Sequence, residues 1–77
     1  MMFEYDQEID VLYVVFKSVG PGEVKRSRSL DERRLLDLDA EGEPVGVEFL
    51  CASEGVHLDG VPHADEIAQV IKSLVPA

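Results

Sequence analysis

The chain has 77 residues, a formal net charge of −9 and a hydrophobic fraction of 45%, which indicates one folded domain rather than a disordered segment. The negative charge disfavours general binding to nucleic acid or to an anionic membrane surface, and no apolar run approaches the ~20 residues of a membrane span. Cys51 is the only cysteine, which excludes an internal disulfide, and the opening residues lack the features of a signal peptide, so we expect a reducing, cytoplasmic location.

Two strands joined by a short loop are predicted at the beginning of the chain. Residues 2–6 are a short candidate, and residues 11–16 (VLYVVF) are a strong one because β-branched and aromatic residues favour extended chain. If residues 7–10 form the loop, Tyr5 pairs with Leu12. The second strand is apolar on both faces, which is typical of a strand covered on two sides.

A third strand is predicted over residues 24–30, after the loop signal of Gly20-Pro21-Gly22. Val24 is its clear inward residue before Leu30. Its remaining side chains are charged or small, which favours a place at the edge of the sheet, where charges discourage unwanted pairing. The alternative is that this basic stretch orders two copies head to tail or contacts a nucleic-acid backbone; the basic residues concerned are Lys25, Arg26, Arg28, Arg33 and Arg34.

The clearest hairpin in the sequence is predicted from residues 34–39 and 44–50. Residues 40–43 form the loop between these two strands, since they combine acidic residues with glycine. Leu38 then faces Val45, and a slip of one residue would exchange the two faces of the hairpin. The apolar pattern therefore predicts the register as well as the strands.

A C-terminal helix is predicted over residues 64–74, directly after Pro62. Asp65 lies in its first turn and Lys72 in its last, as the helix dipole favours, and Pro76 ends it. Its apolar residues follow the spacing i, i+3, i+4, i+7 and form one stripe, made of Ile67, Val70, Ile71 and Leu74.

These elements predict an α+β fold, in which four or five antiparallel strands form a β-meander and one C-terminal helix packs on one face. The helix is expected over Leu12, Val14, Leu36, Leu38, Val45 and Val47. A second apolar face then lacks a cover, and a second copy of the chain is the simplest one, which predicts a homodimer. The alternative is that residues 51–61 fold back over this face. The predicted self-association residues are Val11, Tyr13, Val15, Leu35 and Leu50.

Two motifs, read together, resemble a known family. The segment YDQEIDVLYVVF and the segment LLDLDAEGEPVGVEFLCAS, within residues 5–53, are similar to signatures of a family of small bacterial and archaeal proteins, the domain of unknown function 2283. The resemblance implies a small β-meander domain without an established activity. It also implies, through relatives encoded beside toxin-like proteins, an antitoxin-like role toward a basic protein partner. No functional residue can be carried over from this family.

Four carboxylates around the hairpin loop follow the spacing D-x-D-x-E-G-x₅-E. They belong to Asp37, Asp39, Glu41 and Glu48. Oxygen ligands at such positions hold calcium in helix–loop–helix proteins, with a glycine at the sharp turn. The flanks here alternate as strands, so we interpret the segment first as a hairpin turn and second as a weak calcium site or a small enzyme site.

Other reactive residue types are sparse. Cys51, His57 and His63 match no compact zinc spacing, and Ser53, His57 and Asp59 are sequence neighbours rather than a positioned triad. We therefore expect no cofactor and no catalysis. The sequence favours an uncharacterised interaction module that self-associates and binds protein, with the antitoxin-like role and the carboxylate site as the alternatives.

Overall fold

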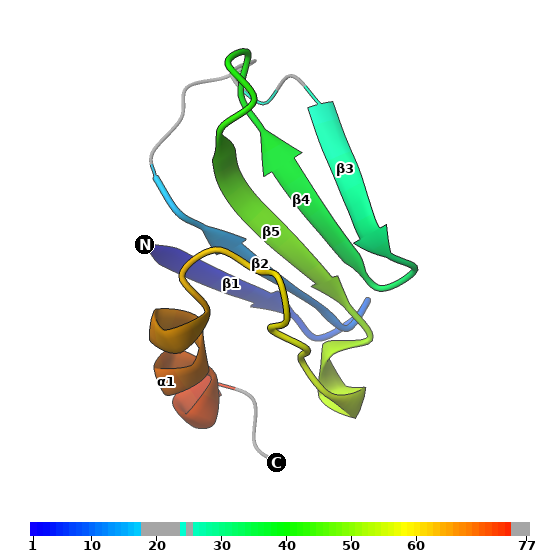
Figure 1. The fold of residues 1–77 in the computed structure, drawn as a ribbon. Helices are drawn as coiled ribbons and strands as arrows, with labels where there is room; N and C mark the ends of the chain where they lie inside the picture. Colours follow the sequence, from blue (N-terminus) through cyan, green and yellow to red (C-terminus); the bar gives the residue numbers. More distant parts are fainter. Residues whose placement is uncertain (18–23, 25, 75–77) are drawn as a thin grey trace.

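The computed structural model describes residues 1–17, 24 and 26–74. It contains five strands, one short 3₁₀ turn and one α-helix (Figure 1). The elements are β1 (Met2–Asp6), β2 (Val11–Val15), β3 (Arg26–Asp31), β4 (Arg34–Leu38), β5 (Pro44–Leu50), the 3₁₀ turn (Ala52–Glu54) and α1 (Ala64–Leu74).

The five strands form one antiparallel sheet in the order β1-β2-β5-β4-β3. This confirms the α+β class, and β3 lies at an edge as predicted. The order departs from a strict meander, because β2 pairs with β5 and not with β3. The long connection from β2 to β3 therefore places β3 at the far edge of the sheet, opposite β1.

The predicted registers are confirmed except at one position. Tyr5 faces Leu12 in the first hairpin, and Leu36 faces Val47 in the last one. Leu38, however, faces Pro44 rather than Val45, since the register shifts by one residue between Asp37 and Leu38. Such a bulge inserts one extra residue near the loop and increases the local twist of the pair.

Four strand boundaries differ from the prediction, one of them being the end of β3, which lies one residue late at Asp31. β3 begins at Arg26 because its partner strand ends at Leu38, which faces Arg26. Val24, expected to point inward, is 39% exposed. β2 ends at Val15 and β4 at Leu38, each one residue early. The predicted helix bounds agree with α1; the expected stop at Pro76 and the Gly20-Pro21-Gly22 loop lie outside the described residues.

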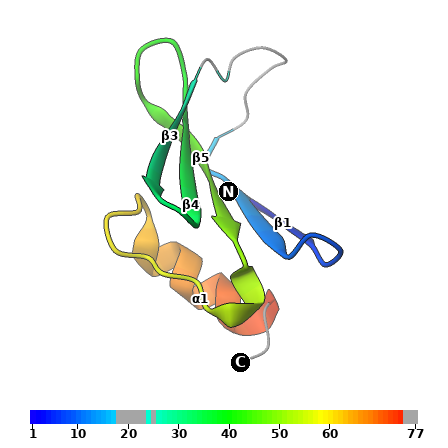
Figure 2. The same cartoon turned by 90° about the vertical axis from the view of Figure 1, so that its right-hand side faces the viewer.

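The hydrophobic core lies on one side of the sheet, between the strands and α1 (Figure 2). Ile67 of α1 is fully buried in it. The segment 51–61 also packs on this side, through Val56, Leu58 and Val61, so it does not fold back over the opposite face. Val45 is buried but lies outside this cluster. The buried cluster consists of Leu12, Val14, Leu36, Leu38, Val47, Phe49, Ala52, Val61 and Ile67.

Candidate functional site

The face of the sheet opposite α1, called the helix-free face below, carries the residues predicted for self-association. Side chains alternate between the two faces of a strand, and the strand pairing places Tyr13 opposite Glu48, Glu48 opposite Leu35, and Val11 opposite Leu50. The structure therefore brings the predicted set together on one face. All five side chains are partly buried: Val11, Tyr13, Val15, Leu35 and Leu50.

A polar cluster interrupts the apolar residues of this face. Asp37 on β4 is only 4% exposed, although it carries a carboxyl group. The hydroxyl of Tyr13 donates a hydrogen bond to its Oδ2 at 2.8 Å, and the hydroxyl of Ser27 donates one to its Oδ1 at 2.6 Å. Each carboxyl oxygen of Asp37 thus has a hydroxyl donor, as a buried polar group requires. The helix-free face is therefore amphipathic rather than uniformly apolar.

Gly46 provides the room for this cluster. It lies on β5, between Val15 on one neighbouring strand and Asp37 on the other. A Cβ at this position would lie 2.8 Å from the carbonyl oxygen of Val14 and 3.2 Å from the hydroxyl of Tyr13. Glycine at this position therefore lets the Tyr13 phenol cross β5 and reach Asp37.

Two titratable groups of the cluster hold their protons more tightly than usual. Burial, followed by the hydrogen bond to Asp37 and the charge of Asp37, raises the pKa of Tyr13 to about 12. Burial also raises the pKa of Glu48, and the nearby charge of Asp37 acts in the same direction. Asp37 and Glu48 are therefore a neighbouring acidic pair on the helix-free face.

An open hollow of about 460 Å³ adjoins Glu48 on the side of β1. Glu48 and Tyr13 line one wall, and residues of β1 and the following loop line the other. Four carboxylates face it without a lysine or an arginine among the lining residues, so its electrostatic potential favours a positively charged group. The lining residues are Glu4, Tyr5, Asp6, Gln7, Glu8, Ile9, Val11, Tyr13 and Glu48.

The structure separates the four carboxylates considered for calcium into two places. Asp37 and Glu48 lie on the helix-free face, as described above. Asp39 closes the hairpin loop: its carboxylate accepts the backbone N–H groups of Glu41 and Glu43 at 3.0 and 2.9 Å and pairs with Lys17 at 3.0 Å. These interactions lower the pKa of Asp39, and the hydrogen bond from the backbone N–H of Glu43 is the largest cause. No group of three metal-ligating side chains converges within the described ranges, and calcium binding stays a prediction.

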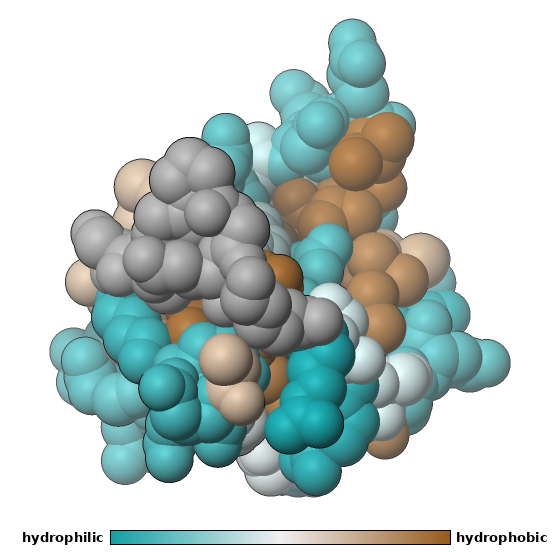
Figure 3. Space-filling view, turned by 90° about the horizontal axis from the view of Figure 1, so that it is seen from above, coloured by the Kyte–Doolittle hydropathy of each residue, from teal (hydrophilic) through white to brown (hydrophobic). Residues whose placement is uncertain are grey.

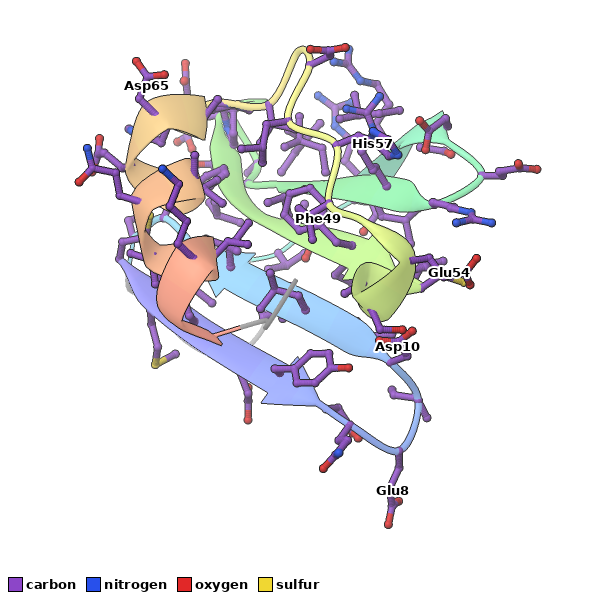
Figure 4. All side chains as sticks on the ribbon, turned by 90° about the horizontal axis from the view of Figure 1, so that it is seen from below. Glu8, Asp10, Phe49, Glu54, His57 and Asp65 are labelled. Atoms are coloured by element: carbon purple, nitrogen blue, oxygen red, sulfur yellow. The ribbon has the colours of Figure 1, made fainter. Side chains whose placement is uncertain are left out.

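A second hydrogen-bonded cluster, around Asp10, was missed by the sequence reasoning. Asp10 has a left-handed backbone (φ 55°) at the end of the β1–β2 loop. Its carboxylate accepts the hydroxyl of Tyr5 at 2.7 Å and both the N–H and the hydroxyl of Ser53, at 2.9 and 2.6 Å. The Ser53 hydroxyl, then the Tyr5 hydroxyl, lowers the pKa of Asp10. Figure 4 shows Asp10 beside the 3₁₀ turn that carries Glu54, whereas Glu8 points away from Asp10 and from this turn.

This cluster joins the two sequence motifs in the folded chain. Tyr5 and Asp10 belong to the first motif and Ser53 closes the second, so the motifs meet in space across 43 residues. Ser53 is engaged with Asp10, and the structure does not bring it to His57. The sequence does contain a signal for this cluster, because all three hydrogen-bonding residues belong to the two family motifs.

Arg34 holds the irregular segment after the 3₁₀ turn against the sheet. Its guanidinium lies 3.0 Å from Oδ2 of Asp31 and donates to the backbone carbonyls of His57 and Asp59 at 3.2 and 2.5 Å. One side chain therefore joins β4, the β3–β4 turn and the segment 51–61. His63 lies apart, with its ring 5.1 Å from that of Phe16.

The fold and its two motif clusters define a small α+β protein whose sheet is covered by helix on one side. A family model for proteins of unknown function, DUF2283, matches residues 2–53, which is more than half of the chain. The chain belongs to this family, as the two motifs indicated. Neither a curated protein nor a solved structure matches it. In the ranges that the structure describes, no helix is long and apolar enough to cross a membrane.

Proposed function

We propose that this protein is a non-catalytic interaction module that forms a homodimer through its helix-free face. The observation that carries the proposal is the shared position of the five partly exposed apolar side chains: Val11, Tyr13, Val15, Leu35 and Leu50. Among the described residues, α1 and the segment 51–61 pack on the opposite face. Figure 3 shows hydrophobic, brown surface open to solvent between hydrophilic side chains.

The size of the chain supports self-association. A 77-residue chain has a thin core, and covering a second apolar face adds burial that one copy lacks. A standard interface buries about 800 Å² on each partner, roughly a sixth of the 5087 Å² accessible surface of one chain. Two-fold dimers are the commonest closed assemblies. Cys51 is a free cysteine, which suits the cytoplasm as the place of action.

Sedimentation equilibrium at micromolar concentration tests this proposal. The wild-type chain is expected to sediment as a dimer, and Val15→Glu is expected to sediment as a folded monomer because it places a charge in the contact face. Val24→Glu is the matched control, since Val24 is an exposed apolar residue outside the proposed contact set. A wild-type protein that stays monomeric at this concentration rules the homodimer out.

The acidic hollow favours a second candidate function, an antitoxin-like role toward a basic protein. Four carboxylates, those of Glu4, Asp6, Glu8 and Glu48, surround it, and such a field accelerates encounter with a positively charged partner. Co-purification with the product of the neighbouring gene tests this role. We expect the double variant Glu4→Lys/Asp6→Lys to abolish co-purification. Retention of the neighbouring product by that variant contradicts a role for the hollow.

A further inference from the structure

Glu48 lies in the middle of the face proposed for self-association. Its cross-strand neighbours are Tyr13 on β2 and Leu35 on β4, and both are contact residues of that face. Asp37, which is only 4% exposed, lies on the same face opposite Gly46, two residues along β5 from Glu48. A second copy covering this face must therefore remove water from Glu48.

Within the part of the chain that the structure describes, the polar groups from neighbouring strands that face Glu48 carry no positive charge to offset that desolvation. They are Glu4 from β1, the Tyr13 hydroxyl from β2, the Ser27 hydroxyl from β3 and Asp37 from β4. The ion pairs found among the described residues engage other carboxylates, namely Asp31, Asp39, Glu54 and Glu66. Ionised Glu48 would thus be buried beside another negative charge, which is strongly unfavourable.

We infer that association through the helix-free face, which rests on the function proposed above, is coupled to the uptake of one proton from solvent by Glu48 of each copy. A neutral carboxyl group on Glu48 costs far less to remove from water than a carboxylate, and it does not repel the nearby carboxylate of Asp37. A two-fold dimer strengthens the effect when it brings the two copies of Glu48 toward each other.

The single chain already shows the start of this coupling. Burial and the nearby charge of Asp37 raise the pKa of Glu48 before any second copy is present. Further burial under a partner acts in the same direction. Association and protonation therefore favour one another, and acidification strengthens the dimer.

The test measures the dimer dissociation constant by sedimentation equilibrium from about pH 8 to about pH 5.5. Uptake of one proton per copy lowers this constant by up to about a hundredfold per pH unit, and we expect a decrease of at least about tenfold across the range. Glu48→Gln, a neutral isostere that has no proton to take up, is expected to dimerise equally at both ends of the range. Glu4→Gln, the matched control for loss of one charge on the same face, is expected to keep the pH dependence.

The outcomes separate the coupling from the dimer itself. A wild-type dimer whose dissociation constant does not change with pH overturns the coupling and leaves the homodimer standing. A dissociation constant that still depends on pH in Glu48→Gln also overturns the coupling, because the pH dependence then comes from the overall charge of the chain. Monomers at every pH for the wild type and for Glu48→Gln overturn both the coupling and the homodimer.

Discussion

The Tyr13 hydroxyl and the Asp37 carboxylate, 24 residues apart in the sequence, are joined by a 2.8 Å hydrogen bond across β5. The two residues lie on β2 and β4, which pair with opposite sides of β5, and the absent side chain of Gly46 leaves the path between them open. This bond connects three strands on the helix-free face. It also gives that face a buried acidic group in the middle of apolar residues, which is part of the basis of the proton-coupled association inferred above.

Gly46→Ala is expected to destabilise the protein by about 2–3 kcal/mol, because the added methyl group meets the Val14 carbonyl and the Tyr13 hydroxyl. Gly60→Ala is the control. The added Cβ meets no atom within 4 Å. This variant is expected to lose only about 1 kcal/mol of unfolding free energy, because alanine is strained in the left-handed backbone at this position (φ 75°). Urea unfolding followed by circular dichroism measures both. Equal losses in the two variants would contradict a steric role for Gly46.

The phenol of Tyr13 is expected to ionise near pH 12 rather than near pH 10. Ultraviolet titration of a Tyr5→Phe variant isolates this group, since the chain has two tyrosines. The folded state holds the proton more tightly than the unfolded state, so this contribution to stability is present below pH 10 and is lost as the pH rises toward about 12. In the Tyr5→Phe/Asp37→Asn variant the midpoint moves back toward 10. An unchanged midpoint there shows that Asp37 does not act on Tyr13.

Tyr13→Phe is expected to reduce the free energy of unfolding by about 1–3 kcal/mol. The substitution keeps the ring but removes one of the two hydroxyl donors of a buried carboxylate, which costs more than an ordinary hydrogen bond. Chemical denaturation near neutral pH measures the change. The double variant Tyr13→Phe/Asp37→Asn provides the check: its loss should fall short of the sum of the two single losses, because the two groups interact.

The Asp10 cluster predicts a rank order of melting temperatures. Asp10→Ala should melt lowest, because it removes an acceptor of three hydrogen bonds and puts alanine in the left-handed region. Asp10→Asn tolerates that backbone and keeps one carbonyl oxygen, and Tyr5→Phe loses a single bond, so both should melt higher. The lowered pKa of Asp10 means that its contribution is present above pH 3.8 and is lost as the pH falls further. An Asp10→Ala variant that melts like the wild type contradicts this role.

Arg34→Lys is expected to destabilise the chain by about 1–2 kcal/mol, because lysine lacks the planar group that reaches Asp31 and two backbone carbonyls together. Hydrogen exchange should become faster in the segment 55–61, which these bonds hold. Arg33→Lys is the matched control, because Arg33 is more exposed than Arg34 and contacts Glu54 at 3.6 Å. The free energy of unfolding of this variant should differ from that of the wild type by less than about 0.5 kcal/mol. Similar effects of both variants would contradict the anchoring role of Arg34.

Local patterns were sufficient to predict the five described strands and the helix of this protein, but not the 3₁₀ turn. Alternation of apolar residues located the strands, and the i, i+3, i+4, i+7 stripe located α1 at its observed bounds. The same alternation predicted the registers of both hairpins, since a slip would expose the apolar face. The register prediction failed only at the bulge near Leu38, where one strand contains an extra residue that the apolar pattern does not reveal.

Contacts between distant segments depended on the tertiary structure. Nothing in the alternation of β2 says that its neighbour is β5, because any strand of matching polarity could pair with it. That pairing decides that Tyr13 reaches Asp37, that Ser53 reaches Asp10, and that Glu48 lies among apolar side chains. Periodicity acts over a few residues, whereas these bonds form only once the sheet has brought together partners 24 and 43 residues apart.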